Sequence, residues 1–283
     1  MSDPSSEGVQ ISTAASRETK TARPDDFVEA LAKGLSILES FDAANPEMTL
    51  SEIARKVGCS PAAARRSLIT LMELGYVGQT SKRFHLRPKI MTLSSGFYYS
   101  AQIDEVLQPH LRELVAKFGD ASSVGTLEQR DVIYIAHNSV QRARRAAAVV
   151  GARYPACATS LGRVLLAGLS DAELDRYFDG LVIEPLTSRT MVDPVQLREE
   201  IERVRKDGYS TTVDQLDYGI TALAVPIRSL DGRTIAALNT SGYSGMVDAD
   251  FLVANRLPEL RAAASRIAGS LTRYPMLVSI IGS

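Results

Sequence analysis

Tryptophan is absent from the 283-residue sequence, which also contains only two cysteines and three histidines. Cys59 and Cys157 are too few for a disulfide framework or a thiolate metal cage, and the histidines lack metal-ligand spacing. No apolar run approaches the ~18 residues that a membrane helix needs. The N-terminus also lacks the apolar core of a secretory signal. These absences predict a soluble cytoplasmic protein without a metal or another cofactor.

Acidic and basic side chains nearly balance over the whole chain, which has a net charge of −1. Their distribution is uneven, because residues 49–90 hold eight lysines and arginines against two acids. This segment therefore carries +6, and the remainder of the chain carries −7. A basic module on an acidic body is typical of nucleic-acid-binding proteins, although a solvated basic face would show the same balance.

Three helices and a hairpin are predicted in the first domain, residues 26–87, which follows a disordered tail at 1–25. Thr49 and Glu52 form a capping box before the second helix, and Ser60-Pro61 supplies a cap and a first-turn proline for the third. Only residues 58–60 separate the second helix from the third, and two helices joined by such a short turn make a helix-turn-helix. The alternating apolar and polar residues that follow predict a β-hairpin, which is the wing. The predicted helices span 27–41, 50–57 and 61–74, with a turn at 42–48 and the wing turn at 79–83.

The third helix is predicted to present small and basic side chains opposite its apolar face. Small residues let a helix backbone approach base edges, where Arg can pair with guanine and methyl groups can meet the thymine methyl. Arg66 projects outward and predicts a base contact, whereas Arg65 lies on the flank and predicts a phosphate contact. Double-stranded DNA is therefore the predicted partner, and a plain three-helix packing unit is the alternative. The predicted DNA contacts are Thr49, Ser60, Ala62, Ala63, Arg65, Arg66, Thr70, Lys82 and Arg83.

A linker helix at 88–103 and a second domain at 104–275 are predicted to follow. Residues 104–118 are amphipathic, and strand-like runs then mix with helices up to a last helix at 250–273. Three strand-like runs precede the middle helices, the third at 143–150, and three more follow them. This pattern predicts an α+β protein whose second domain is an α/β sensor with a mostly antiparallel sheet.

Enzyme signatures are missing from the second domain. Ser160, His137 and Asp214 can be imagined as a triad, but no G-x-S-x-G elbow surrounds the serine, and no phosphate-binding glycine motif occurs. Residues 132–170 instead hold five arginines and no acid, and Ser160 opens a helix whose N–H groups suit a carboxylate. Polar groups at 239–241 are predicted to line the same apolar site. A solvated arginine surface and simple helix capping are the structural alternatives.

Five motifs in order carry a resemblance to the isocitrate lyase regulator (IclR) family of bacterial transcription factors, from about residue 28 to residue 271. They are LAKGLSILESF, MTLSEIARKVGCSPAAARRSLITLMELGYV, ARYPACATSLGRVLLA, VRKDGYSTTVDQLDYGITALAVPI and AALNTSG. The third helix and the segment PACATSLGRVLLA look most like the PcaR/PobR branch, which regulates the β-ketoadipate and hydroxybenzoate pathways.

The resemblance implies a GAF-like effector domain, dimers that often pair into tetramers, and control of a catabolic operon by a small carboxylate. Hydroxybenzoate, protocatechuate or a ring-cleavage product would be such an acid. Asn239 stands where a small hydroxyl is frequent in relatives, and Ala222 where some carry a thiol. A small hydrolase with an incidental helix-turn-helix and a protein–protein adaptor are the rival classes. The implied effector contacts are Ser160, Leu161, Gly162, Asp214, Ala222, Asn239 and Ser241.

Overall fold

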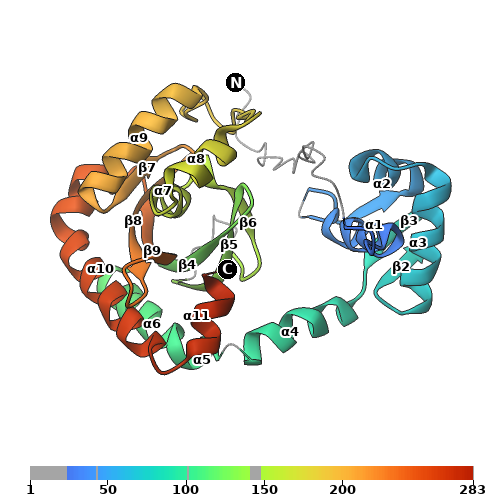
Figure 1. Ribbon diagram of the computed structural model, residues 1–283, viewed down its shortest axis with the longest axis horizontal. Helices are drawn as coiled ribbons and strands as arrows, with labels where there is room; N and C mark the ends of the chain where they lie inside the picture. Colours follow the sequence, from blue (N-terminus) through green and yellow to red (C-terminus); the bar gives the residue numbers. More distant parts are fainter. Residues whose placement is uncertain (1–23, 43, 101, 141–147, 283) are drawn as a thin grey trace, which may run out of the picture. The chain divides into compact units, whose positions relative to one another are not determined.

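The structure, a computed structural model, describes residues 24–42, 44–100, 102–140 and 148–282. The chain divides into two compact units, residues 1–96 and residues 97–283 (Figure 1). The predicted tail at 1–25 and the predicted strand at 143–150 lie mostly outside the described residues. No helix within the described ranges is long and apolar enough to cross a membrane.

The first unit is a helix-turn-helix followed by a winged hairpin, which confirms that part of the sequence prediction. Its elements are α1 (Glu29–Glu39), β1 (Glu47–Thr49), α2 (Leu50–Val57), α3 (Pro61–Glu73), β2 (Val77–Thr80) and β3 (Arg83–Leu86), with the sheet order β1-β3-β2. The prediction of a turn at 42–48 is wrong for Glu47 and Met48, which begin β1. Three residues next to a proline show no local strand pattern, and only their pairing with residues 83–85 of β3 creates this strand.

Local capping signals determine where α2 and α3 begin and end. The hydroxyl of Thr49 accepts from the Glu52 N–H while the Glu52 carboxylate accepts from the Thr49 N–H, which confirms the capping box. Gly58 ends α2 in the left-handed conformation at φ 68°, which a residue with a Cβ rarely adopts. Ser60 then caps α3, and its Oγ accepts from the Ala63 N–H at 3.3 Å. These interactions make the turn between the two helices short and sharp.

A small apolar core holds the first unit together. Side chains from all three helices and the wing meet in it, among them Ile37, Ile53, Leu68 and Phe84. On α1, Leu31 is 63% exposed and Leu35 is 48% exposed. The apolar face of α1 is therefore only partly buried within this unit.

The segment predicted as a linker helix and a following amphipathic helix is divided into shorter pieces. A 3₁₀ turn (Pro88–Ile90) leads into α4 (Met91–Ser100), and α5 (Ile103–Val106) and α6 (Gln108–Phe118) follow. The expectation of one continuous helix over 104–118 is wrong at Leu107. Pro109 lies in the first turn of α6 and has no N–H to donate to the preceding turn, so the helix restarts there.

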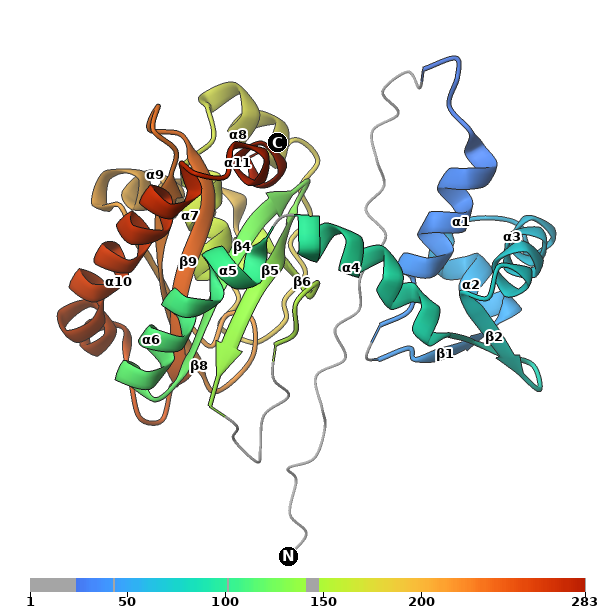
Figure 2. The same cartoon turned by 90° about the horizontal axis from the view of Figure 1, so that it is seen from below.

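The second unit is built on one six-stranded antiparallel sheet with helices on both faces (Figures 1 and 2). The strands are β4 (Ala121–Glu128), β5 (Asp131–Ser139), β6 (Arg153–Pro155), β7 (Ser210–Val213), β8 (Ile220–Arg228) and β9 (Thr234–Tyr243), in the order β6-β5-β4-β9-β8-β7. The helices are α7 (Ser160–Ala167), α8 (Asp171–Phe178), α9 (Pro194–Asp207), α10 (Ala249–Leu271) and α11 (Pro275–Ile281). This confirms the predicted α+β class with a mostly antiparallel sheet.

Two details of the second unit differ from the sequence prediction. Besides β4, the strand β6 pairs with β5; it begins at Arg153, and the sequence did not predict it. The helix α11 was not predicted, because Pro275 and a short apolar run resemble a chain end more than a helix. Its Leu277 and Ile281 join the core that α10 covers.

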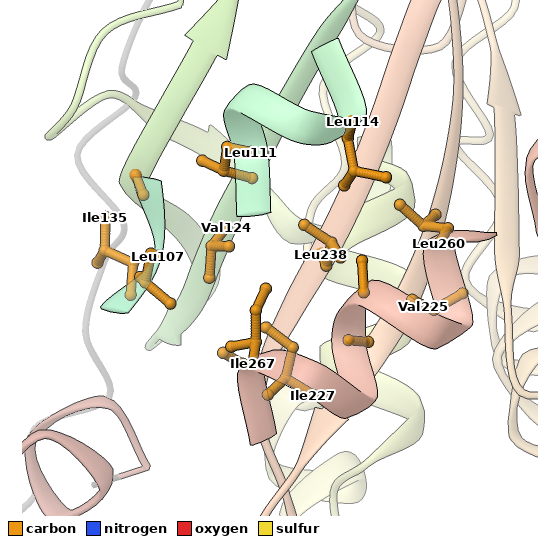
Figure 3. Close-up of a cluster of buried hydrophobic side chains, with 14 of the residues drawn as sticks. Leu107, Leu111, Leu114, Val124, Ile135, Val225, Ile227, Leu238, Leu260 and Ile267 are labelled. Carbon is orange, nitrogen blue, oxygen red and sulfur yellow. The ribbon is translucent and has the colours of Figure 1, made fainter. Parts of the chain in front are cut away.

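The two faces of the large sheet carry separate apolar cores. On one face, α5, α6 and α10 cover inward side chains such as Val124, Ile135 and Leu238 (Figure 3). On the other face, α7, α8 and α9 cover Val132, Tyr134 and Ala237. Because successive strand residues point to opposite faces, the remaining positions of each strand can be assigned to a face by counting.

Candidate functional site

The exposed face of α3 has the composition that the helical projection predicted. Ala64, Leu68 and Leu71 are buried in the core of the first unit. On the opposite side, Arg65 and Arg66 are exposed, as are Ala62 and Thr70, while Ala63 is half-buried. A helix with this surface can approach another molecule closely at its N-terminal half and bring two guanidinium groups with it.

Seven cations of the first unit make no ion pair within the described part of the chain: Lys33, Arg55, Arg65, Arg66, Lys82, Arg87 and Lys89. Lys82 lies at the tip of the wing, beside Ser81, whose φ is 56°. Arg83, by contrast, is already engaged. Its guanidinium lies 3.5 Å from the Glu47 carboxylate and 3.8 Å from that of Glu52, and it donates to the Glu47 carbonyl. The unpaired cations leave this unit with a positive surface that is available for phosphates.

Three hydroxyls that were predicted as DNA contacts make local hydrogen bonds instead of standing free. Thr49 Oγ1 donates to Glu52 Oε2 at 2.9 Å, and the Thr49 N–H and hydroxyl together hold the pKa of Glu52 below its ordinary value. Ser60 Oγ accepts at the N-terminus of α3, and Thr70 Oγ1 donates to the Arg66 carbonyl at 3.2 Å. Thr49 and Ser60 therefore shape the ends of the two helices.

In the second unit, α7 lies across the sheet with its N-terminus directed along β9. Gly168, after its last turn, lies against Thr234 at the start of β9. Near its first turn, the Leu161 side chain meets Gly125, which pairs with Ala237 of β9. The free N–H groups of the first turn of α7 consequently face the part of β9 that contains Asn239 and Ser241.

One side chain at this helix end has an unmet hydrogen-bonding capacity. Ser160 is 1% exposed, and its Oγ has no hydrogen-bond partner within the described residues. The helix itself does not need this hydroxyl, because Thr159 Oγ1 already caps α7 by accepting from the Gly162 N–H at 2.9 Å. A buried hydroxyl without a partner costs free energy, so its presence next to free N–H groups favours a bound acceptor.

A row of polar side chains crosses the sheet on the face that α7 covers. Strand register places His137, Ser123 and Asn239 side by side on β5, β4 and β9. Ser123 Oγ lies 2.9 Å from His137 Nδ1, and the Ser123 N–H donates to Asn239 Oδ1 at 2.8 Å. Ser241 and Ala222 form the next pair along β9 and β8 on the same face. The structure thus brings Ser160, Asn239, Ser241 and Ala222 to one face of the sheet.

Leu161, Gly162 and Asp214 stabilise the structure around the N-terminus of α7 and the neighbouring loop. Leu161 is fully buried against the sheet, and a Cβ at Gly162 would overlap the backbone of Ala156, so only glycine fits there. Asp214 adopts φ 53°, and its Oδ1 accepts from the Gly219 N–H at 2.7 Å and from Ser244 Oγ at 2.8 Å. Its carboxylate therefore fixes the loop between β7 and β8.

The arginines of the acid-free segment 132–170 have protein partners where the structure describes them. Arg163 is 2% exposed; its Nε donates to the Cys157 carbonyl and its Nη2 to Gln215 Oε1, each at 2.9 Å. Burial lowers the pKa of Arg163 and raises that of the Cys157 thiol. Arg153 pairs with Asp131 at 3.0 Å. The three arginines at 142, 144 and 145 lie outside the described residues.

Sequence reasoning overlooked Ser123 and considered His137 only as part of a triad. Strand alternation within residues 121–128 would have placed Ser123 and Val124 on opposite faces of the sheet, but no local signal showed which face α7 covers. The structure also shows that Ser160, His137 and Asp214 form no hydrogen-bonded triad, because each bond of Asp214 and the Nδ1 bond of His137 go to other groups.

Asn239→Ala is expected to destabilise the protein by about 1–3 kcal/mol, because it removes the acceptor of a buried backbone N–H at Ser123. Chemical denaturation followed by circular dichroism measures the change. Asn255→Ala is the matched control, because that exposed amide donates only to the carbonyl of Phe251 on its own helix. An equal loss of unfolding free energy in the two variants would show that the Ser123–Asn239 hydrogen bond contributes no more to stability than the exposed one.

Two family models match the sequence. The IclR helix-turn-helix domain matches residues 30–81, and the C-terminal domain of the bacterial transcriptional regulator IclR matches residues 97–269. The chain is 34% identical over 247 residues to the Pca regulon regulatory protein of Pseudomonas putida, which covers 87% of this chain and 85% of the relative.

Solved structures show the same arrangement of elements. A putative transcriptional regulator from Rhodococcus sp. RHA1 is 40% identical, with a TM-score of 0.72 over 87% of this chain and 99% of that one. A double mutant of the inducer-binding domain of PobR from Acinetobacter, in complex with 3-hydroxybenzoic acid, is 30% identical, with a TM-score of 0.55 over 58% of this chain and 96% of that one.

Proposed function

This chain belongs to the IclR family of bacterial transcriptional regulators, and from that premise we propose how it binds DNA and which kind of ligand controls it. The observation with the most weight is that a basic helix face in one unit and a buried polar cluster at a helix N-terminus in the other occur in a single chain. The first suits operator DNA in the cytoplasm, and the second suits a small carboxylate.

The N-terminal half of α3 enters the major groove of DNA. Arg66 hydrogen-bonds a base edge there, Ala62, Ala63 and Thr70 allow close approach, and Arg65 contacts a phosphate. Lys82 at the wing tip contacts another phosphate. Thr49, Ser60 and Arg83 act as positioning residues, because their hydrogen bonds and ion pairs fix the ends of α2 and α3 and the edge of the wing.

The effector is a small, aromatic carboxylic acid whose carboxylate binds the N-terminus of α7. The free N–H groups and Ser160 Oγ receive it, and Asn239, Ser241 and Ala222 line the sheet beneath. Leu161, Gly162 and Asp214 hold the helix and the neighbouring loop in place. The inducer-binding domain of PobR, bound to 3-hydroxybenzoic acid, and the Pca regulon protein support an aromatic acid and a catabolic operon as its target.

Effector binding changes DNA affinity only if the protein has two arrangements that differ in DNA affinity and if the acid binds one arrangement more tightly than the other. A homo-oligomer, either a dimer or a tetramer, provides such arrangements, because two helix-turn-helix units must match two half-sites. The exposed apolar side chains Leu31 and Leu35 on α1 support self-association. The protein is not an enzyme under this proposal, since Ser160 Oγ has no hydrogen-bond partner among the residues that the structure describes and so no base beside it there. Turnover of an ester by the purified protein would favour the hydrolase alternative instead.

Ser160→Asp is expected to abolish the rise in melting temperature that 3-hydroxybenzoate or 4-hydroxybenzoate produces in the wild-type protein. The new carboxylate would occupy the N-terminus of α7 and repel the ligand's charge, whereas saturation of the wild-type protein at about 100 times Kd adds about 2.7 kcal/mol of stability. Thermal denaturation of the full-length protein with each acid is the measurement.

Ser170→Asp is the matched control for that experiment. It adds the same charge at the N-terminus of α8 in the same unit, where Ser170 is a surface cap. The control should keep the full ligand-induced shift. A shift that survives in Ser160→Asp would place the acid elsewhere.

A further inference from the structure

The polar row of His137, Ser123 and Asn239 extends beyond the groups needed to bind a carboxylate. Asn239 Oδ1 accepts a hydrogen bond from the Ser123 N–H at 2.8 Å, so this side chain is anchored to the neighbouring strand β4. Ser123 is 2% exposed and presents its hydroxyl to His137 on the next strand. The row therefore ends, on β5, in a hydrogen-bonded serine–histidine pair that the carboxylate site at α7 does not explain.

The serine–histidine pair can both donate and accept a hydrogen bond. If Ser123 donates to His137 Nδ1, the imidazole carries its proton on Nε2; in the other tautomer, Nδ1 donates and the serine proton is free to turn. A hydroxyl group needs such an environment, because it also donates one proton and accepts through its oxygen. A second carboxylate would instead need cations or several N–H donors.

The described cations near this face do not supply that charge. Arg163 is buried with its donors directed to Cys157 and Gln215, and Arg153 on β6 pairs with Asp131. The neutral character of the row thus favours a neutral polar group on the ligand. Among the residues that the structure describes, this row therefore matches a hydroxyl of a mono-acid better than a second carboxylate.

Distance and shape agree with one ligand that reaches both ends of the site. His137 and Asn239 are two strands apart, which corresponds to about 10 Å across a sheet. Small side chains lie between and beside them on this face, namely Ser123 and Ala222. A flat ring can lie over such residues with its carboxylate at Ser160 and its hydroxyl toward β5.

We propose that His137, held by Ser123, is the specificity-determining residue that hydrogen-bonds a ring hydroxyl of the effector. This assignment rests on the effector site proposed above at the N-terminus of α7. It makes the effector a hydroxylated aromatic mono-acid and excludes a dicarboxylic ring-cleavage product as the preferred ligand.

The test compares affinities of the full-length protein for 4-hydroxybenzoate, 3-hydroxybenzoate, benzoate and adipate by isothermal titration calorimetry. We expect the wild-type protein to bind at least one hydroxybenzoate about tenfold or more tightly than benzoate, because a site built for a hydroxyl rejects an analogue that lacks it. Adipate should bind more weakly than either. In His137→Leu, the preference for the hydroxybenzoate should fall to about twofold or less while benzoate affinity is retained.

Two further variants separate recognition from folding. Ser123→Ala should reduce the same preference, because it frees the histidine without removing it. His110→Gln changes a histidine of α6, which packs against the opposite face of the sheet, and should leave the preference unchanged. The melting temperature of each unliganded variant shows that it is folded.

Each remaining result would overturn the assignment. An unchanged preference in His137→Leu would show that the hydroxyl binds elsewhere, and an equal loss of all acids would show that His137 only supports the fold. Tighter binding of adipate would reverse the inferred ligand class. If no acid bound the wild-type protein, the effector site itself would be wrong, which Ser160→Asp tests separately.

Discussion

Arg66→Ala is expected to weaken binding to the specific operator by roughly 1–3 kcal/mol and to relax base preference at one position. Arg66 is exposed on the same face of α3 as Ala62 and Thr70, and it has no ion pair within the described residues. The variant would lose the proposed bidentate contact of Arg66 to guanine, which a small side chain cannot replace. Fluorescence anisotropy with a selected operator, its single-base variants and random DNA measures both effects.

Arg65→Ala provides the comparison within the same helix. A phosphate contact carries no sequence information, so this variant should lose a similar fraction of its affinity on operator and on random DNA. Its salt dependence should also be less steep, since one fewer counterion is released. If Arg66→Ala behaves in the same way, Arg66 is a phosphate contact and base recognition lies elsewhere on α3.

Asp120→Ala is expected to lower the free energy of unfolding by about 3–5 kcal/mol, because it leaves a buried guanidinium without its counter-ion. Arg256 of α10 is 5% exposed and donates to Asp120 Oδ2 at 2.7 Å and to Thr240 Oγ1 at 3.1 Å. Its guanidinium also lies 4.9 Å from the ring centre of Phe118. Urea denaturation monitored by circular dichroism reports the loss.

Asp175→Ala is the matched control, since Asp175 pairs with Arg198 on the surface of the same unit. Exposed pairs contribute about 0–1 kcal/mol, so this variant should remain close to wild type. The double variant Asp120→Leu with Arg256→Met should regain part of the stability, because it removes both buried charges. A loss below 1 kcal/mol for Asp120→Ala would show that water or another group solvates Arg256.

The first unit was largely predictable because its signals are local. The capping box at Thr49, the left-handed Gly58 and the Ser60-Pro61 helix start each depend on residues within four positions of one another. The exposed face of α3 follows from the same 3.6-residue periodicity. The strand β1 was missed because its three residues become a strand only through pairing with β3, more than thirty residues away.

The second unit was predictable in class but not in contacts. Alternating apolar residues predicted most strands, and the cap at Thr159 predicted the start of α7. The sequence singled out residues 132–170 for their five arginines without an acid, but tertiary packing buries one of them, Arg163, against Gln215, which lies 52 residues away in sequence. Burial depends on which elements cover a residue, and no local pattern contains that information.

The sequence by itself determined the two-unit organisation, the winged helix and the set of side chains exposed on α3, because each depends on short-range periodicity and capping. Only the tertiary structure decided which polar residues meet beneath α7. The sheet order places β4 between β5 and β9, so Ser123 contacts both His137 and Asn239, the latter 116 residues away in sequence. Strand order is set by packing of the whole unit, and it therefore lies beyond what neighbouring residues can encode.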